Sequence, residues 1–205
     1  MRKRNLLIWV LFFGSLWGIS EVVVGKHLFD ADIPYASAWI SAWAFFILAV
    51  ARGVMNKPGT STAIGGIAAV FRLVNASYVC HIFGIFLLGV AFDLAFSILA
   101  KHRKTIYIKS SLAGVVGAYS GHLIFALFAT YIIRNPFWIS GGLPKISEHV
   151  FISGSFVALA SALLVPLGYW IGHKRIPLAA QRSRWVYNGA LIFTVIFWAL
   201  ARLAG

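Results

Sequence analysis

The chain has 205 residues, of which 60% are hydrophobic and 11% are charged, and its formal net charge is +13 at pH 7. Only five residues are acidic, so the chain lacks the polar surface that a soluble domain of this length needs. A single cysteine, Cys80, excludes an intrachain disulfide and a cysteine metal cluster. We therefore predict an all-α, polytopic membrane helix bundle, with residues 1–205 as one domain.

Seven apolar stretches follow one another along the chain, and most have the roughly 20 residues that a membrane-spanning helix needs. They cover residues 5–25, 35–52, 60–76, 79–100, 107–133, 149–172 and 185–203. The third stretch is short and contains Arg72, and very few residues separate it from the fourth. These two stretches are predicted to form a tight helical hairpin within a bundle of six to seven transmembrane helices.

The basic residues between these stretches fall almost entirely on alternate sides. Thirteen of the 18 share a side with the N-terminus: Arg2, Lys3, Arg4, Arg52, Lys57, Lys101, Arg103, Lys104, Lys109, Lys174, Arg175, Arg182 and Arg184. Cytoplasmic loops carry the excess of Lys and Arg, so we expect a plasma-membrane protein with a cytoplasmic N-terminus and an external C-terminus. Contact of these loops with anionic inner-leaflet lipid accounts for the net charge, and nucleic acid is not predicted as a partner.

With this orientation, most ionisable side chains near the spans are placed in the outer half of the protein. They are Glu21, His27, Asp30, Asp32, Arg72, His81, Glu148 and His149. Asp93 and His122 are placed deeper, where a pairing between them is conceivable. Charged groups inside a membrane are costly and often functional, which favours a binding site near the outer face. The structural alternative is an ion pair between Glu21 and Arg72.

Aromatic and small residues add two further candidate features. Most aromatic residues near the span ends are typical of an interfacial belt, but Trp39, Tyr78 and Trp138 are candidates for stacking on a flat heterocycle. Gly14 and Gly18 form a small-residue face on the first span, a pattern common where membrane helices pack together.

The stretch from Gly14 to His27, GSLWGISEVVVGKH, is followed by KPGTSTAIGG at residues 57–66 and by a glycine-to-aspartate run at residues 84–93. Together these segments resemble the substrate-binding S components of energy-coupling factor uptake transporters, over roughly residues 5–100. In that family a small helical bundle captures a vitamin or a metal ion near the outer surface. It then associates with a membrane T subunit and two cytosolic ATPases.

The resemblance implies that residues 26–34, 77–78 and 134–148 form the loops over the ligand, and that Gly14 and Gly18 contact the T subunit. The chain departs from the family in its seventh span and in lacking the usual alanine pair on the first helix. It also contains no Walker A pattern, so the ATPase would be a separate chain.

We therefore expect a membrane subunit that captures a small vitamin or vitamin precursor, with no cofactor. Arg72 or a helix end is expected to neutralise an acidic group of the ligand, while Glu21 and His81 hydrogen-bond its heteroatoms. The predicted substrate-binding residues are Glu21, Trp39, Arg72, Tyr78, His81, His122, Trp138 and His149.

Two alternatives use some of the same residues. In the first, His27, His81, Glu148 and His149 bind a divalent transition metal as cargo, although no His-x-x-x-His or Cys-x-x-Cys spacing supports this. In the second, a membrane-embedded enzyme uses Glu21, His122 or Asp93 as an acid or base on a lipid. The sequence contains no nucleophilic serine motif, zinc-protease motif or paired-aspartate diphosphate motif.

Overall fold

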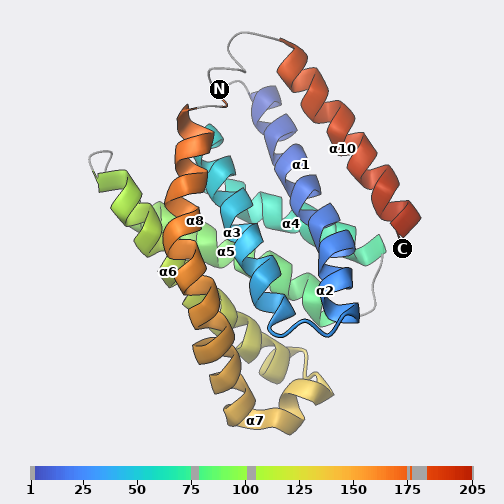
Figure 1. Ribbon diagram of the computed structural model, residues 1–205, viewed down its shortest axis with the longest axis vertical. Helices are drawn as coiled ribbons and strands as arrows, with labels where there is room; N and C mark the ends of the chain where they lie inside the picture. The colour runs from blue at the N-terminus through green and yellow to red at the C-terminus, as the bar shows by residue number, and fades with distance from the viewer. Residues whose placement is uncertain (1–2, 75–78, 101–104, 175, 177–183, 205) are drawn as a thin grey trace.

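The computed structural model describes residues 3–74, 79–100, 105–174, 176 and 184–204. These residues form a helical bundle that contains no strand in its described part (Figure 1). Six of its helical segments are long and apolar enough to cross a membrane: Arg4–Asp30, Ala36–Met55, Cys80–Leu99, Ile106–Ile132, Pro136–Lys174 and Trp185–Leu203. A shorter apolar helix covers Thr60–Leu73. The all-α class and the multi-pass membrane bundle are therefore confirmed.

The helices follow the predicted order with two additions at one end of the bundle. Their bounds are α1 (Lys3–Ser20), α2 (Lys26–Asp30), α3 (Ala36–Met55), α4 (Thr60–Val74), α5 (Val79–Leu99), α6 (Ile106–Leu127), α7 (Pro136–Glu148), α8 (Gly154–Lys174) and α10 (Arg184–Ala204). Segments predicted as loops contain the short helix α2 and the kinked helix α7. Three π-helical segments, at Glu21–Gly25, Phe128–Ile132 and His149–Ser153, extend α1 and α6 and precede α8.

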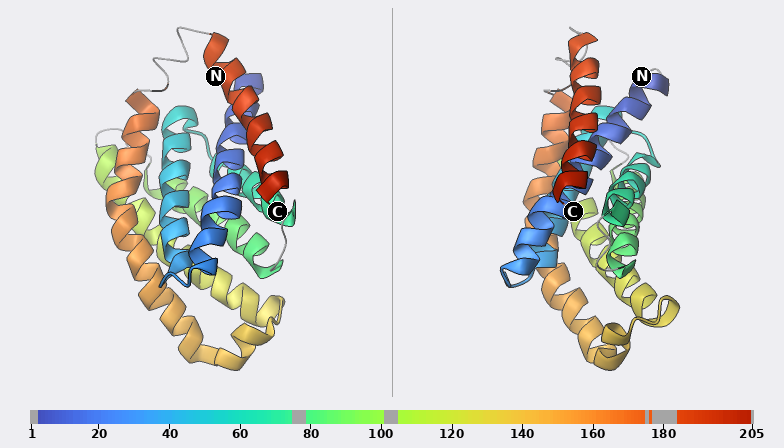
Figure 2. Two further views of the ribbon diagram at one scale, coloured as in Figure 1. Left: turned by 45° about the vertical axis from the view of Figure 1, so that its right-hand side comes forward. Right: turned by 90° about the vertical axis from the view of Figure 1, so that its right-hand side faces the viewer.

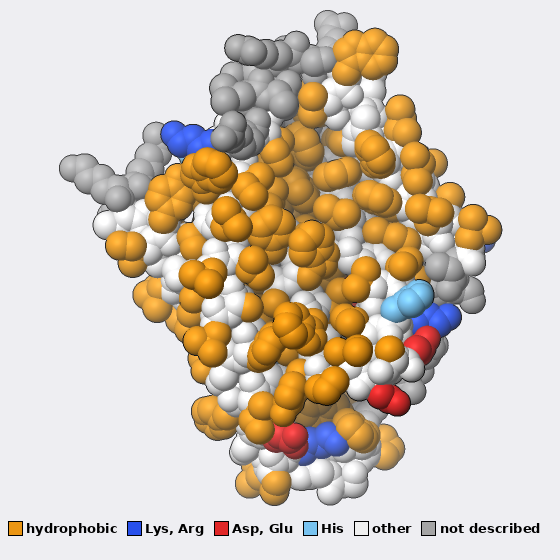
Figure 3. Space-filling model, viewed as in Figure 1, with side chains coloured by type: hydrophobic (Ala, Val, Ile, Leu, Met, Phe, Trp, Pro, Cys, Tyr) orange, Lys and Arg blue, Asp and Glu red, His pale blue; other side chains and the backbone are white. Residues whose placement is uncertain are grey.

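The long helices lie in two rows. Helices α10, α1, α3 and α8 form one row, and α4, α5 and α6 form the other, while α7 crosses one end and joins α6 to α8 (Figures 1 and 2). Helix α4 packs against α1 at one edge, and α6 packs against α8 at the other. Hydrophobic side chains cover most of the visible face between the ends, as expected for a surface that faces lipid (Figure 3).

Glycine and alanine allow the central helices to approach closely. Gly53 of α3 faces the backbone of Tyr169 and Gly172 in α8, where a Cβ atom would clash. Further along the same contact, Gly168 lies against the carbonyl of Phe46. Van der Waals contact between small residues is a main source of helix association in a membrane, where lipid competes for apolar surfaces. The α3–α8 contact is therefore a close backbone contact at the middle of the first row.

The predicted hairpin between the third and fourth spans is present. Helices α4 and α5 pack together, and Gly65 lies against the Cα atom of Gly89. The residues that join them, 75–78, lie outside the described part of the chain. Gly65 thus takes part in a contact within the hairpin.

The small-residue face of α1 packs inside the chain, against α4, whereas Gly14 and Gly18 were predicted to contact a T subunit. A Cβ atom added to Gly14 would lie less than 3.0 Å from Ile67 of α4, and one added to Gly18 would lie equally close to Phe71. This face is occupied by α4. A second subunit could reach it only if α1 and α4 separated.

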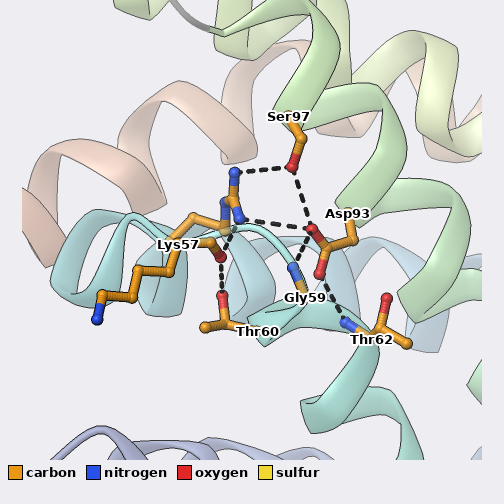
Figure 4. A network of polar contacts seen from close by, with 7 residues as sticks. Lys57, Gly59, Thr60, Thr62, Asp93 and Ser97 are labelled. Carbon is orange, nitrogen blue, oxygen red and sulfur yellow. Dashed lines mark hydrogen bonds and ion pairs between the residues drawn. The ribbon is translucent and has the colours of Figure 1, made fainter. Parts of the chain in front are cut away.

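A buried polar network joins α3, α5 and the start of α4 (Figure 4). Asp93 of α5 forms an ion pair with Arg52 of α3, with 3.4 Å between Oδ1 and Nη1. Its carboxylate also accepts hydrogen bonds from the backbone N–H groups of Gly59 (3.0 Å) and Thr62 (2.9 Å). Ser97 donates to Asp93 and accepts from Arg52. The conceivable pairing of Asp93 with His122 is therefore wrong.

This network explains how α4 begins inside the bundle. The first N–H groups of a helix have no partner within the helix, and a carboxylate near them is favoured by the helix dipole. Asp93 supplies that carboxylate from another helix. Arg52 also donates to the carbonyl of Lys57, so the turn between α3 and α4 is held by side chains of both α3 and α5.

We predict that Asp93→Ala lowers the free energy of unfolding by about 3 kcal/mol, because it leaves Arg52 buried without its partner. Thermal unfolding in detergent, followed by circular dichroism, measures this change. Lys57→Ala is the matched control, since only the backbone carbonyl of Lys57 takes part in the network. Equal stability of the Asp93→Ala variant and the wild type would show that the network does not hold the turn.

We also predict that Gly18→Ala lowers the free energy of unfolding by about 1–3 kcal/mol, because the new methyl group overlaps Phe71. Gly66→Ala in α4 is the control, since no atom lies within 4 Å of the added Cβ. Its better helix propensity makes it neutral or stabilising by about 1 kcal/mol at most. The same unfolding measurement compares both variants, and a Gly18→Ala variant as stable as Gly66→Ala would contradict the packing.

Candidate functional site

An open cavity of about 1230 Å³ lies at the end of the bundle that carries α2 and α7. Its walls come from the π-helical segment after α1, from α2, from the start of α3, the end of α4 and the start of α5, and from parts of α6, α7 and the segment before α8. The Arg52–Asp93 network lies at the opposite ends of α3, α4 and α5. Acidic and basic side chains gather at the lower end of the visible face, where α2 and α7 lie (Figure 3). The predicted orientation makes this the outer end.

Six of the eight predicted substrate-binding residues line this cavity: Glu21, Arg72, His81, His122, Trp138 and His149. Trp39 does not line it, because its side chain is 51% exposed and packs edge-to-face against Phe156 with 4.7 Å between ring centroids. Tyr78 lies outside the described residues. The structure thus brings together side chains from α4, α5, α6, α7 and the π-helical segments that begin at Glu21 and His149.

Glu21 and Arg72 lie side by side at the wall of the cavity, with only 8% and 7% of their surfaces exposed. Trp17, one helical turn before Glu21, donates its indole N–H to the Glu21 carboxylate at 3.0 Å. Arg72 donates to the backbone carbonyl of Glu21 at 3.2 Å. Both side chains are described, and no ion pair joins the carboxylate to the guanidinium. The alternative of a Glu21–Arg72 ion pair is therefore wrong.

The free atoms of these two groups favour a polar ligand. Arg72 Nε is buried and has no hydrogen-bond partner in the structure. The hydrogen bond from Trp17 to the Glu21 side chain engages Oε1. Because the carboxyl group and the guanidinium are buried but form no ion pair with each other, each can still pair with a ligand group of opposite charge.

Two histidines meet on another wall of the cavity. The rings of His122 and His149 lie 4.8 Å apart, and Trp138 packs edge-to-face against His149 at 5.1 Å. His122 Nδ1 lies 2.9 Å from the carbonyl of Ala118. Because a carbonyl only accepts, Nδ1 carries the hydrogen, and Nε2 of the neutral ring is an acceptor. His122, which is 3% exposed, therefore presents an acceptor rather than a donor from its second nitrogen.

The remaining predicted outer residues surround these groups. His81 stacks on Phe29 with 5.5 Å between ring centroids. The carboxylates of Asp30, Asp32 and Glu148 also line the cavity, together with the cationic side chains of Lys26 and Lys145. Four of the five acidic residues of the chain, Glu21 included, are thus found at this one place.

Helix α7, predicted as a loop, positions Trp138 and Lys145. Asn135 accepts a hydrogen bond from the backbone N–H of Phe137 at 3.1 Å and caps the helix, and Pro136 follows the cap. This Asn–Pro pair is a helix start signal in the sequence. Gly142, with φ of 55° and ψ of −152°, kinks the helix and, with Pro144, conceals that signal.

Sequence reasoning missed several polar residues of the cavity: Ser37, Ser41, Cys80, Asn135, Lys145 and Ser153. It also missed Trp17, which is buried behind Glu21. Trp17 and Glu21 are four residues apart and therefore lie on one helix face. This spacing could have indicated their contact from the sequence. The small hydroxyl residues carry no such signal, because serine is common wherever membrane helices pack.

The structure does not assemble the alternative metal site. His27 does not line the cavity, and its Nδ1 contacts the carbonyl of Val23 at 2.8 Å. In the described part of the chain, no three His, Cys, Asp or Glu side chains are close enough together to hold a metal ion. The acid and base candidates of the enzyme alternative are also divided, since Asp93 belongs to the network at the other end.

No protein-family model matches the chain, and no curated protein or solved structure matches it. The fold and the cavity define a multi-pass helical membrane protein that has a large, charged cavity at one end of its bundle.

We predict that the cavity opens to the outside of the cell. In a Cys80→Ala background, Ser37→Cys places a thiol at the cavity, while Lys57→Cys places one in the turn at the opposite end. A membrane-impermeant maleimide applied to intact cells is expected to label the first variant. The second should react only after the membrane is permeabilised. The reverse pattern would invert the predicted orientation.

Proposed function

We propose that this protein is the substrate-binding subunit of a plasma-membrane transporter that takes up a small vitamin or vitamin precursor. The observation that carries the proposal is the large open cavity whose wall holds buried Glu21 and Arg72 without an ion pair between them. Intramembrane ionisable groups that face a cavity commonly mark a substrate pathway. Their place at the predicted outer end fits capture of a molecule from outside.

The size and lining of the cavity suit a small organic molecule. Ligand sites usually have volumes of roughly 300–1000 Å³ and combine aromatic walls with a few placed polar groups. This cavity is slightly larger and remains open, with Phe125, Trp138 and Phe29 among its aromatic walls. A ring of the ligand stacks there, while Arg72 binds an anionic group and His122 accepts a hydrogen bond.

Delivery to the inside requires other subunits in this proposal. The resemblance to S components supplies the expected partners, a membrane T subunit and cytosolic ATPases. Because α4 covers Gly14 and Gly18, the T subunit would contact another part of the bundle.

We predict that Arg72→Gln weakens ligand binding by at least about tenfold, which corresponds to the roughly 1.5–3 kcal/mol of a hydrogen bond to a charged group. Native mass spectrometry of the protein purified gently from its own membranes measures ligand occupancy. Arg72→Lys, which keeps the charge, is expected to retain part of the binding. Normal occupancy of the Arg72→Gln variant would remove Arg72 from the site.

We also predict that the two tryptophans differ. Trp138→Ala removes an aromatic wall of the cavity and should lower occupancy, whereas Trp39→Ala should leave it unchanged because Trp39 lies outside. Loss of a stacking partner costs about 0.5–1.5 kcal/mol beyond the buried area. Equal effects of the two substitutions in the same mass-spectrometric measurement would contradict the assignment of this cavity as the binding site.

A further inference from the structure

The acidic residues of this chain are distributed unevenly. The chain has 18 Lys and Arg residues but only five Asp and Glu residues, and four of those five line the cavity. The fifth, Asp93, is paired with Arg52 at the opposite end. A strongly basic membrane protein has no need of carboxylates at a single cavity for solubility. Their gathering there creates a local potential that attracts a positive group.

The cavity is nevertheless not simply acidic. Its lining carries the four acidic side chains together with three basic ones, Lys26, Arg72 and Lys145. Lys145 lies over the ring of Phe137, with its Nζ 3.0 Å from the ring centroid. A ligand with only a positive charge would meet Arg72 at the buried wall, and one with only a negative charge would meet Glu21 there. The lining is therefore complementary to a molecule that carries both charges.

The buried pair of Glu21 and Arg72 supports the same conclusion. Trp17 supplies a neutral donor to the Glu21 carboxylate, and a neutral backbone carbonyl accepts from Arg72. Each group is thus hydrogen-bonded to a neutral partner, and no ion pair joins the carboxylate to the guanidinium, although the two are close enough to attract each other. Burying charges without opposite partners is unfavourable, and truncating one partner of a complete pair is strongly so. A ligand with one cationic and one anionic group completes both pairs at once.

We propose that the cavity selects small zwitterions, with a cationic nitrogen of the ligand against Glu21 and a carboxylate or phosphate against Arg72. This inference rests on the proposed function and names the class of its substrate. His122 adds a third requirement, because its Nε2 accepts from an N–H or O–H of the ligand.

The test uses the full-length protein in lipid nanodiscs, incubated with the low-molecular-mass filtrate of yeast extract. Bound compounds are released after washing and identified by tandem mass spectrometry, and the compound that copurifies from native membranes is identified in the same way. The expected compound carries both charges at neutral pH. Glu21→Gln and Arg72→Gln are each expected to reduce its capture at least about tenfold, and Trp39→Ala to leave capture unchanged.

Analogues of the captured compound then separate a binding role from a structural one. The wild type should prefer the zwitterion over the analogue that lacks the cationic nitrogen, and Glu21→Gln should abolish that preference. Arg72→Gln should likewise abolish the preference over the analogue that lacks the anionic group. A variant that merely misfolds would lose all binding and would also show an altered unfolding transition, whereas these variants are expected to retain binding of the matching analogue.

The outcomes distinguish the two proposals. Specific capture of a compound with one charge, or with none, would overturn the zwitterion assignment while leaving the transporter proposal in place. Absence of any compound that is enriched on the wild type relative to the Glu21→Gln/Arg72→Gln double variant would overturn both.

Discussion

The cost of burying charge inside a membrane governs this structure. A charged side chain within a helix bundle needs an opposite charge or several hydrogen bonds, because lipid and apolar side chains provide neither. At one end of the bundle Asp93 and Arg52 meet this need within the chain, through an ion pair and hydrogen bonds from Gly59, Thr62 and Ser97. At the other end Glu21 and Arg72 are hydrogen-bonded to neutral groups. The first arrangement contains an ion pair within the chain, and the second does not.

The Arg52–Asp93 network also helps to position the residues at the cavity. Asp93 accepts hydrogen bonds from the start of α4 and fixes the turn that leads into it. Helix α4 has 15 residues and carries Arg72 in its last turn. Anchoring the first residues of α4 therefore sets the position of Arg72 at the cavity. Packing of Gly14 and Gly18 against Ile67 and Phe71 holds the same helix against α1, which carries the chain on to Glu21.

The all-α class, the order of the spans and the α4–α5 hairpin could be predicted from the sequence, because these features depend on local apolar composition. A side-chain contact could not be predicted from the sequence where the two residues are distant in the chain. Asp93 pairs with a residue 41 positions away, and no spacing rule predicts that. The small-residue face at Gly14 and Gly18 has the same pattern whether it meets another subunit or a helix of its own chain. Helix α7 was predicted as a loop because Gly142 and Pro144 are residues typical of loops, although the segment is a capped helix.

Local backbone geometry links the spans to the cavity. All three π-helical segments of the described chain, Glu21–Gly25, Phe128–Ile132 and His149–Ser153, lie at the cavity end of the bundle. A π-helical turn is rare and is frequently found at functional sites. Two of these segments begin at residues that line the cavity, Glu21 and His149. The occurrence of this rare geometry on two separate helices is expected where it orients side chains toward a ligand. The network around Asp93, whose partners are all internal, joins ordinary α-helices.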